Sequence, residues 1–204
     1  PESTLTGAPA ITLPNTTTEL TNYAGQACAG SDAVSLLTAF QYSCNTAFVE
    51  MGIDIGTDAL RDTAHAFGIG ETYDLGIPTS PGALGDLPDE AALGQSSIGQ
   101  RDVTMSTLQA AVMAATIAND GERMKPYVVD KITSSNLRDI KTIKPQSLNR
   151  AIPEETAATI EEMMRASEQH TAGASAPDVA SKTGTAEHAE GSAPHTWYVA
   201  YLPD

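Results

Sequence analysis

Two short runs near the end of this chain restrict its possible folds more than any other stretch. The first, Val179 to Glu187, contains Lys182-Thr183-Gly184-Thr185, and the second, Trp197 to Leu202, is aromatic and β-branched and ends at Pro203. Runs of this kind, separated by turn-forming residues, predict a β-hairpin. A glycine inside a strand marks a bulge or a place where another molecule lies close to the backbone. We therefore interpret the first run as a strand that presents a lysine, a hydroxyl group and a bare backbone edge to a ligand.

One helix is predicted on each side of a Ser-Cys-Asn tripeptide earlier in the chain. Ser31-Asp32 caps the first, which ends at about residue 42, and the second covers 46–51 and is stopped by Gly52. Ser43 and Asn45 therefore lie at a helix junction and can face one site across a tight turn. The residue types alone leave a second interpretation open, because serine and asparagine are also common helix caps that need no chemistry.

The rest of the chain is predicted to alternate helices with loops and turns. Thr57 or Asp58 begins a further helix, and the Gly- and Pro-rich segment 71–92 forms a long surface loop. Ser106 and Gln109 form a capping box at the start of a helix that reaches about residue 119. The remaining predicted elements are a polar hairpin over 127–133 and 140–144, and a helix that Pro153 opens, with Ile160, Met163 and Met164 as its apolar stripe.

The composition disfavours several classes of function. The 204 residues carry a net charge of −15, which argues against nucleic acid and anionic membrane surfaces because their phosphates would repel the chain. No run reaches the roughly 18 apolar residues of a membrane span. The histidines lack metal-ligand spacing, so neither a metal ion nor another cofactor is predicted. Cys28 and Cys44 are the only cysteines, and the sequence is compatible with two free thiols or with a disulfide bond.

Three motifs now stand in a characteristic order along the chain: Ser43-Cys44-Asn45, the segment Gly94–Gln109, and Lys182-Thr183-Gly184. Together they resemble the transpeptidase domain of penicillin-binding proteins, and the details of the second and third motifs are similar to the class B branch in its actinobacterial form. The resemblance covers nearly the whole chain. It implies an α+β fold of the penicillin-recognising serine transpeptidase or β-lactamase type, with an antiparallel sheet flanked by helices. It also favours chemistry over capping for Ser43 and Asn45.

The chain departs from the family pattern in three places. Arg101 and Thr107 stand where the family usually has a glycine-like residue and a proline, and both are expected to be peripheral. The third departure is larger: no serine is followed three residues later by lysine, so the family's Ser-x-x-Lys motif is missing. The resemblance therefore implies that residues 1–204 are part of a transpeptidase domain. The nucleophile segment is expected before residue 1, and the last strand and C-terminal helix after residue 204.

The resemblance assigns catalytic roles to three residues. In the family, a serine attacks the carbonyl between two terminal D-alanines of a peptidoglycan stem peptide, and an amine of a neighbouring stem resolves the acyl-enzyme. By resemblance, Ser43 relays the proton of the leaving group, and Asn45 binds the substrate amide and holds the missing lysine. Lys182 supplies a positive charge that attracts the terminal carboxylate and favours the neutral form of that neighbouring lysine.

Three consecutive residues are implied to bind the substrate, namely Thr183, Gly184 and Thr185. The two threonine hydroxyls can hydrogen-bond the terminal carboxylate, and Gly184 leaves the strand open. The backbone N–H of Thr185 would supply one of two oxyanion donors, and the other belongs to the missing serine.

The implied function is peptidoglycan D,D-transpeptidation through an acyl-serine intermediate, on the extracytoplasmic face of the cell membrane, with an anchor in an N-terminal segment outside this chain. The implied partners are the D-Ala-D-Ala stem peptide, β-lactam antibiotics, and a glycosyltransferase or a protein of the division or elongation machinery. Two alternatives stay open. A D,D-carboxypeptidase or endopeptidase would use water as the acceptor, and a β-lactam sensor or a cell-wall scaffold would not turn substrate over.

Overall fold

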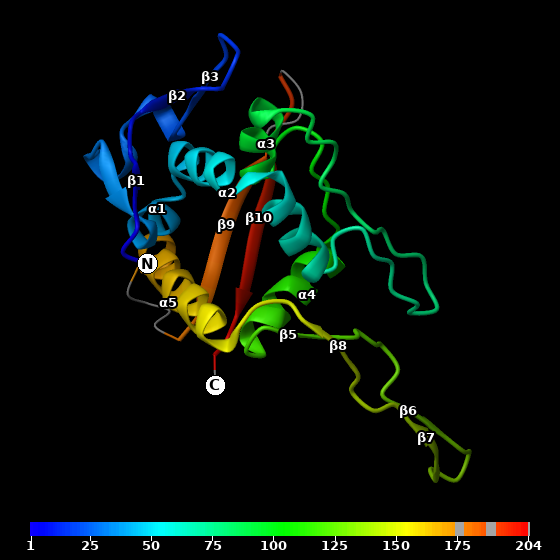
Figure 1. Ribbon diagram of the computed structural model, residues 1–204. Coiled ribbons are helices and arrows are strands. Elements are labelled where there is room, and N and C mark those ends of the chain that lie inside the picture. The colour runs from blue at the N-terminus through cyan, green and yellow to red at the C-terminus, as the bar shows by residue number, and fades with distance from the viewer. Residues whose placement is uncertain (174–177, 187–190, 204) are drawn as a thin grey trace.

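The computed structural model describes residues 1–173, 178–186 and 191–203 (Figure 1). These residues form five α-helices and ten strands, with short 3-10 turns at Tyr23–Gly25 and Cys28–Gly30. The helices are α1 (Leu36–Tyr42), α2 (Asn45–Ala66), α3 (Glu90–Ser97), α4 (Thr107–Ala118) and α5 (Glu154–Ala172). The strands are β1 (Thr4–Thr6), β2 (Ala10–Thr12), β3 (Glu19–Thr21), β4 (Ala33–Ser35), β5 (Glu122–Met124), β6 (Lys131–Thr133), β7 (Asp139–Thr142), β8 (Ser147–Arg150), β9 (Ala180–Ala186) and β10 (His195–Tyr201).

The hairpin predicted near the end of the chain lies at the centre of the fold. β9 and β10 pair antiparallel, so that Ala180 lies opposite Tyr201 at one end and Ala186 lies opposite His195 at the other. α5 packs against β9, α4 packs against β10, and α1 packs against α5, so helices flank the two strands (Figure 1). Ala180 and Ser181 are completely buried by this packing. The predicted α+β arrangement of antiparallel strands flanked by helices is confirmed.

The start of α1 differs from the prediction. Ser31-Asp32 does not cap this helix, because the next residues form β4, in which the buried Val34 lies opposite Leu5 of β1. Ser35 is the cap instead, and its Oγ accepts a hydrogen bond of 3.1 Å from the backbone N–H of Thr38. A strand pairing with a distant segment therefore overrides the local capping signal.

The two helices predicted after the Ser-Cys-Asn tripeptide are one helix, α2. Gly52 does not stop it: a Cβ atom at this position would lie 1.9 Å from Oγ of Ser97 on α3, so glycine allows the two helices to pack closely. The backbone changes direction at Gly56 instead, where φ is 82°. The helix predicted to begin at Thr57 or Asp58 is the second half of α2.

The end of the predicted surface loop is helical. α3 begins after Asp89, whose Oδ1 accepts a hydrogen bond of 2.8 Å from the backbone N–H of Ala92. Leu93 and Gly94 are buried where α3 packs against α2. Because most of the residues that α3 buries are small or polar, the sequence lacks the apolar stripe that usually reveals a helix. The predicted loop therefore ends at Asp89.

Two other helix predictions are confirmed. At the start of α4, the N–H of Gln109 donates to Oγ of Ser106, and the N–H of Ser106 donates to Oε1 of Gln109, which completes the predicted capping box. Pro153 precedes α5, and Met163 and Met164 of the predicted stripe are buried. Among the described residues, no helix is long and apolar enough to cross a membrane.

The structure answers the question that the two cysteines left open. Cys28 and Cys44 form a disulfide bond, and their Cα atoms are 5.6 Å apart. Both cysteines are buried in a cluster with Val34, Ala39 and Ala47. The bond joins the second 3-10 turn to the residue that caps α2, which is also the middle residue of the Ser-Cys-Asn tripeptide.

A buried arginine connects the long loop after α2 to the strand pair β5–β8. The side chain of Arg123 is 5% exposed, and its terminal nitrogens donate to both carboxylate oxygens of Glu71 at 2.8 and 3.0 Å. Arg123 also donates to the hydroxyl of Tyr73 and to Oδ1 of Asn149. Asn149 in turn donates to the backbone oxygen of Ala66 at the end of α2. One guanidinium group therefore fixes three segments of the chain.

Replacing Arg123 by methionine is expected to lower the free energy of unfolding of the full-length protein by about 2 kcal/mol, because the buried hydroxyl of Tyr73 and the half-buried amide oxygen of Asn149 lose their donor. The loss is limited because the side chain of Glu71 is 48% exposed and can be rehydrated. Urea-induced unfolding measures the change. Arg61→Met, which removes an exposed ion pair with Asp58, is the control and should cost less than about 0.5 kcal/mol. Equal effects of the two substitutions would contradict the prediction.

Candidate functional site

The Ser-Cys-Asn tripeptide forms the tight turn that was predicted between two helices. Ser43 ends α1 in the left-handed conformation, with φ 56° and ψ 50°, Cys44 caps α2, and Asn45 is the first residue of α2. The side-chain amide of Asn45 donates a hydrogen bond of 2.9 Å to the backbone oxygen of Thr21 in β3. This bond fixes the orientation of the Asn45 amide, and the disulfide of Cys44 fixes the turn itself.

The structure brings Lys182 of β9 to this turn. Nζ of Lys182 donates to Oγ of Ser43 at 2.8 Å, although the two residues are 139 positions apart in the sequence. Nζ also donates to the backbone oxygen of Thr183 at 2.8 Å and lies 5.7 Å from the centre of the Phe40 ring. The ammonium group is thus held by two oxygen acceptors and one aromatic face. Two of the three motifs predicted to form one site therefore meet through a direct hydrogen bond.

Burial lowers the pKa of Lys182 to about 8, because removal of water disfavours the charged ammonium. The group is still mainly protonated at neutral pH and loses its proton in the mildly alkaline range. Its positive charge therefore stands beside the Ser43 hydroxyl under neutral conditions. This charge can attract an anionic ligand group and can favour proton movement through Ser43.

The resemblance implies that the positive charge of Lys182 attracts the carboxylate of benzylpenicillin. Acylation of the full-length protein by this compound is therefore expected to slow as the pH rises through about 8, where Lys182 loses that charge. The second-order acylation rate constant, measured between pH 6 and 10, tests this. In Lys182→Arg the guanidinium stays charged over this range, so any remaining activity should lack the alkaline decline. An alkaline decline of the same shape in both proteins would contradict the assignment to Lys182.

A cleft of about 920 Å³ opens beside the turn. Its lining includes Ser43 and Asn45 from the turn and Thr183, Gly184 and Thr185 from β9. The remaining walls come from β3 and the 3-10 turn that follows it, the ends of α1 and α5, and the last part of α3 with the residues after it. Five of the six predicted site residues therefore face one cavity, and Lys182 reaches its wall through the hydrogen bond to Ser43.

Gly184 is more open than the fold requires. A Cβ atom at this position would meet only Cβ of Trp197 on β10, at an ordinary contact distance of 3.6 Å. The packing therefore has room for a larger residue, in contrast to Gly52. A glycine at a cleft wall that packing does not demand agrees with close approach of a ligand to the β9 backbone.

The predictions from the sequence missed some residues of the cleft and placed another one wrongly. Arg101 was expected to be peripheral, but it lines the cleft in a left-handed conformation with φ 64°, the conformation that a glycine-like position in the family favours. Tyr42 and His170 also line the cleft, and their ring centres are 4.2 Å apart. The position of Tyr42 directly before Ser43 was the one available signal for this pair.

A buried carboxylate on α5 supports β9. Glu168 of α5 is 3% exposed and accepts hydrogen bonds from Oγ of Ser181 and, at 2.8 Å, from the hydroxyl of Tyr198. The bond to this carboxylate raises the pKa of Tyr198. Ser181 precedes Lys182, and Tyr198 lies opposite Thr183 in the hairpin. Glu168 therefore holds both strands next to the residues that face the cleft.

The chain matches known proteins over nearly its whole length. A family model described as the penicillin-binding protein transpeptidase domain matches residues 4–204. The peptidoglycan D,D-transpeptidase PbpA of Mycolicibacterium smegmatis is 46% identical over 211 residues, which cover 100% of this chain and 43% of that protein. The PbpA of Mycobacterium tuberculosis is 43% identical, over 98% of this chain and 42% of that protein. The chain therefore spans less than half the length of these relatives.

Solved structures agree with the described fold. The crystal structure of the M. tuberculosis protein has a TM-score of 0.92 and 43% identity, and the match covers 98% of this chain and 47% of that one. The penicillin G acyl-enzyme complex of the same protein has a TM-score of 0.93 and 42% identity, over 98% and 46% of the two chains. The resemblance seen in the three sequence motifs is confirmed by these matches. The chain belongs to the penicillin-binding protein transpeptidase family.

Proposed function

We propose that the protein of which this chain is a part is a peptidoglycan D,D-transpeptidase that works through an acyl-serine intermediate. The observation that supports this most directly is the hydrogen bond from Lys182 to Ser43 at the wall of a cleft that also contains Asn45. A cation, a hydroxyl and an amide around one cavity suit the transfer of an acyl group from a substrate that ends in a carboxylate. We further propose that residues 1–204 are part of the catalytic domain and that a Ser-x-x-Lys segment N-terminal to them supplies the nucleophile.

The reaction can be divided among the residues of this chain. In the first half, the nucleophilic serine forms an ester with the penultimate D-alanine of the stem peptide, and the peptide bond to the terminal D-alanine breaks. Ser43 relays a proton to the departing amine, and Asn45 binds the substrate amide. In the second half, an amine of a neighbouring stem attacks the ester, a new peptide bond forms, and the serine regains its proton.

The substrate is held by charge and by the strand edge. Lys182 attracts the terminal carboxylate, and the hydroxyls of Thr183 and Thr185 hydrogen-bond it. The backbone N–H of Thr185 donates to the oxyanion that forms at the scissile carbonyl. A β-lactam offers a carboxylate and a reactive carbonyl in a similar arrangement, so it acylates the same serine. We place this chemistry on the extracytoplasmic face of the cell membrane, where the stem peptides are.

Intact-mass spectrometry of the full-length protein, before and after incubation with benzylpenicillin, tests the acyl-enzyme. We expect the mass to rise by that of one penicillin, and replacement of the serine in the Ser-x-x-Lys segment should prevent the increase. A full-length protein that forms no adduct would exclude the transpeptidase and a β-lactam sensor and would leave a scaffold function.

A second measurement separates transfer from hydrolysis. The full-length protein is given a pentapeptide stem that ends in D-Ala-D-Ala, together with an amine-bearing acceptor stem, and the products are separated by chromatography. We expect a cross-linked dimer and free D-alanine. Release of D-alanine without the dimer would identify a carboxypeptidase, and an adduct with penicillin but no turnover of the stem would identify a sensor.

A further inference from the structure

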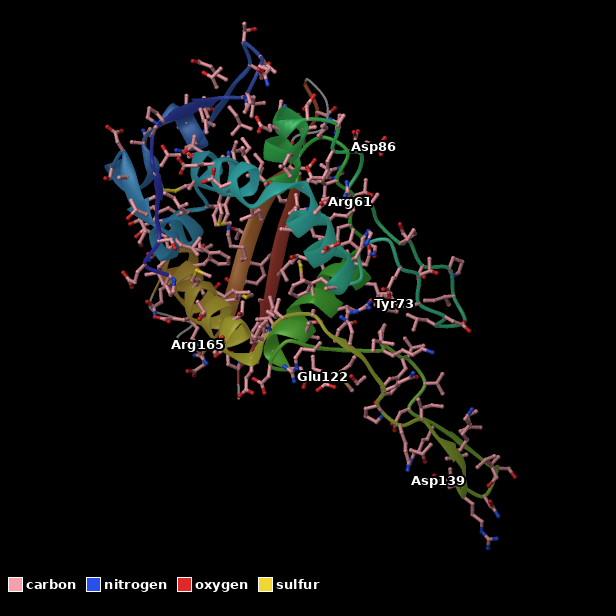
Figure 2. The ribbon with its side chains drawn as sticks, viewed as in Figure 1. Arg61, Tyr73, Asp86, Glu122, Asp139 and Arg165 are labelled. Atoms are coloured by element: carbon pink, nitrogen blue, oxygen red, sulfur yellow. A yellow bond between two sulfur atoms is a disulfide. The ribbon has the colours of Figure 1, made fainter. Side chains whose placement is uncertain are left out.

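A long arm projects from the body of the domain, far from the cleft. It comprises residues 125–146, runs out from β5, turns between β6 and β7, and returns to β8, as Figure 1 shows. Asp139 lies toward its far end in Figure 2. β6 and β7 pair only with each other in the described structure, so each has an open edge. The predicted polar hairpin is therefore confirmed, with shorter strands than expected.

The arm has a charge opposite to that of the rest of the chain. It contains five of the eleven Lys and Arg residues but only two of the twenty-six Asp and Glu residues. Lys131 pairs with Asp139 at 3.6 Å. The ion pairs found among the described residues leave the other four cations without a carboxylate partner: Lys125, Arg138, Lys141 and Lys144. A basic arm on a chain of net charge −15 is an attractive surface for an acidic partner.

Large apolar side chains are exposed along the whole arm. They are 44% exposed or more, and they come from both limbs and from the tip: Tyr127, Val128, Val129, Ile132, Leu137 and Ile140. Alternating cations and exposed apolar groups are unfavourable for an arm that only meets water, because the apolar surface is left uncovered. Their spread along the arm means that an elongated partner, rather than contact at the tip alone, would cover them.

A cavity of about 280 Å³ lies at the base of the arm. Its apolar lining includes Leu75 from the long loop, Val128 from the outgoing limb and Ile143 from the returning limb. Lys125 and Lys144 also line it, and Asp74 is the one carboxylate among its lining residues. The cavity is suited to one apolar side chain that is followed or preceded by an acidic residue.

We propose that the arm is a docking site for an acidic, extended segment of another protein, which runs along the open strand edge and places one apolar side chain in the basal cavity. Strand addition satisfies the free backbone groups, and the cations select acidic residues. An anionic bilayer would cover the tip around Leu137 but would leave the basal cavity unfilled. This site is separate from the transpeptidase cleft and does not depend on the proposed function.

Selection of displayed random peptides on the full-length protein tests the proposal. We expect the enriched peptides to combine Asp or Glu with aliphatic or aromatic residues, and synthetic fluorescein-labelled copies should bind less tightly as salt is added. Lys144→Glu should weaken their binding about tenfold, as expected for reversal of a charge at an interface. Arg61→Glu, an equal charge change on α2 away from the arm in Figure 2, should leave binding within about twofold.

Several outcomes would overturn the proposal. The arm would not be the peptide-binding site if the enriched peptides lacked acidic residues, or if they bound Lys144→Glu and the unchanged protein with equal affinity. Binding of phosphatidylglycerol vesicles that Lys144→Glu abolishes would assign the arm to a lipid surface, and concentration-dependent self-association with the same sensitivity would assign it to a second copy. If no peptide is enriched and Lys144→Glu lowers the Tm far more than Arg61→Glu, another segment of the same chain covers the arm.

The same variants keep this test apart from that of the transpeptidase. Acylation by benzylpenicillin is measured in Lys144→Glu and Arg61→Glu and should equal that of the unchanged protein, because neither residue lines the cleft. Loss of peptide binding with normal acylation supports the docking site. Failure of acylation in every protein, with peptide binding retained, would refute the proposed enzyme and leave the docking site in place.

Discussion

In the full-length protein, Lys182→Ala should reduce the rate of acylation by benzylpenicillin by at least about a hundredfold. Lys182 is the cation that contacts Ser43, with its Nζ 2.8 Å from Oγ, and its removal leaves the hydroxyl without that donor. In the role proposed for Lys182, the penicillin carboxylate also loses the charge that attracts it. The measurement is the second-order rate constant for formation of the covalent adduct, followed by intact mass or with a fluorescent penicillin.

The fold should survive this substitution, so loss of activity can be assigned to the site. Lys182 is only partly buried and contacts the end of α1 rather than the core below β9. The Tm of Lys182→Ala should therefore lie within a few degrees of that of the unchanged protein. Thr183→Val is the matched control on the same strand and should lower acylation less, because it removes a hydrogen bond but no charge. Unchanged acylation by Lys182→Ala would refute the site.

Replacement of both Cys28 and Cys44 by alanine should lower the free energy of unfolding by about 3 kcal/mol, because the bond closes a loop of about 16 residues in the unfolded chain. Urea-induced unfolding of the full-length protein under oxidising conditions measures this loss. Because both sulfurs are buried in one apolar cluster, the alanines also leave unfilled volume, which adds to the loss.

The reduced protein separates these two contributions. Treatment with a thiol reductant opens the loop but keeps both sulfur atoms in the cluster. Reduction alone should therefore lower the free energy of unfolding by most of the roughly 3 kcal/mol that loop closure provides. The alanine variant should then be the less stable of the two. Equal stability of the oxidised and reduced forms would show that the bond does not restrict the unfolded chain.

The parts of the fold that the sequence predicts well are those with strong local signals. The β9–β10 hairpin has two runs of strand-forming residues, and the capping box of Ser106 and Gln109 satisfies backbone groups within one turn of helix. Neither element needs a contact with a distant segment in order to form at these residues. They were therefore predicted at nearly the correct residues.

The predictions that failed depend on contacts between distant segments. Gly52 looks like a helix stop, but its lack of a side chain serves packing against Ser97, which is remote in sequence. α3 has no apolar stripe because small residues such as Gly94 allow close packing against α2. Ser31-Asp32 is a good local cap, but pairing of β4 with β1 places the helix start later. In each case tertiary packing outweighed a local preference.

The candidate site was predicted through its motifs rather than its geometry. Ser43 and Asn45 alone were compatible with simple helix caps, and the resemblance to a family decided between the two interpretations. The sequence did not reveal that Nζ of Lys182 bonds Ser43 directly or that Thr21 orients Asn45. Arg101 was placed at the periphery because a departure from a motif carries no information about which cavity the residue lines.

The sequence separation between Ser43 and Lys182 also sets the order in which the parts of the candidate site can form. At a synthesis rate of about 5–20 residues per second, the 139 positions between them correspond to about 7–28 s on the ribosome. During this interval the Ser-Cys-Asn turn can form and its disulfide can close, since both depend on residues within the first fifty. Contacts of high sequence separation form late because closing the intervening chain costs entropy. The cleft is therefore completed last, when β9 docks.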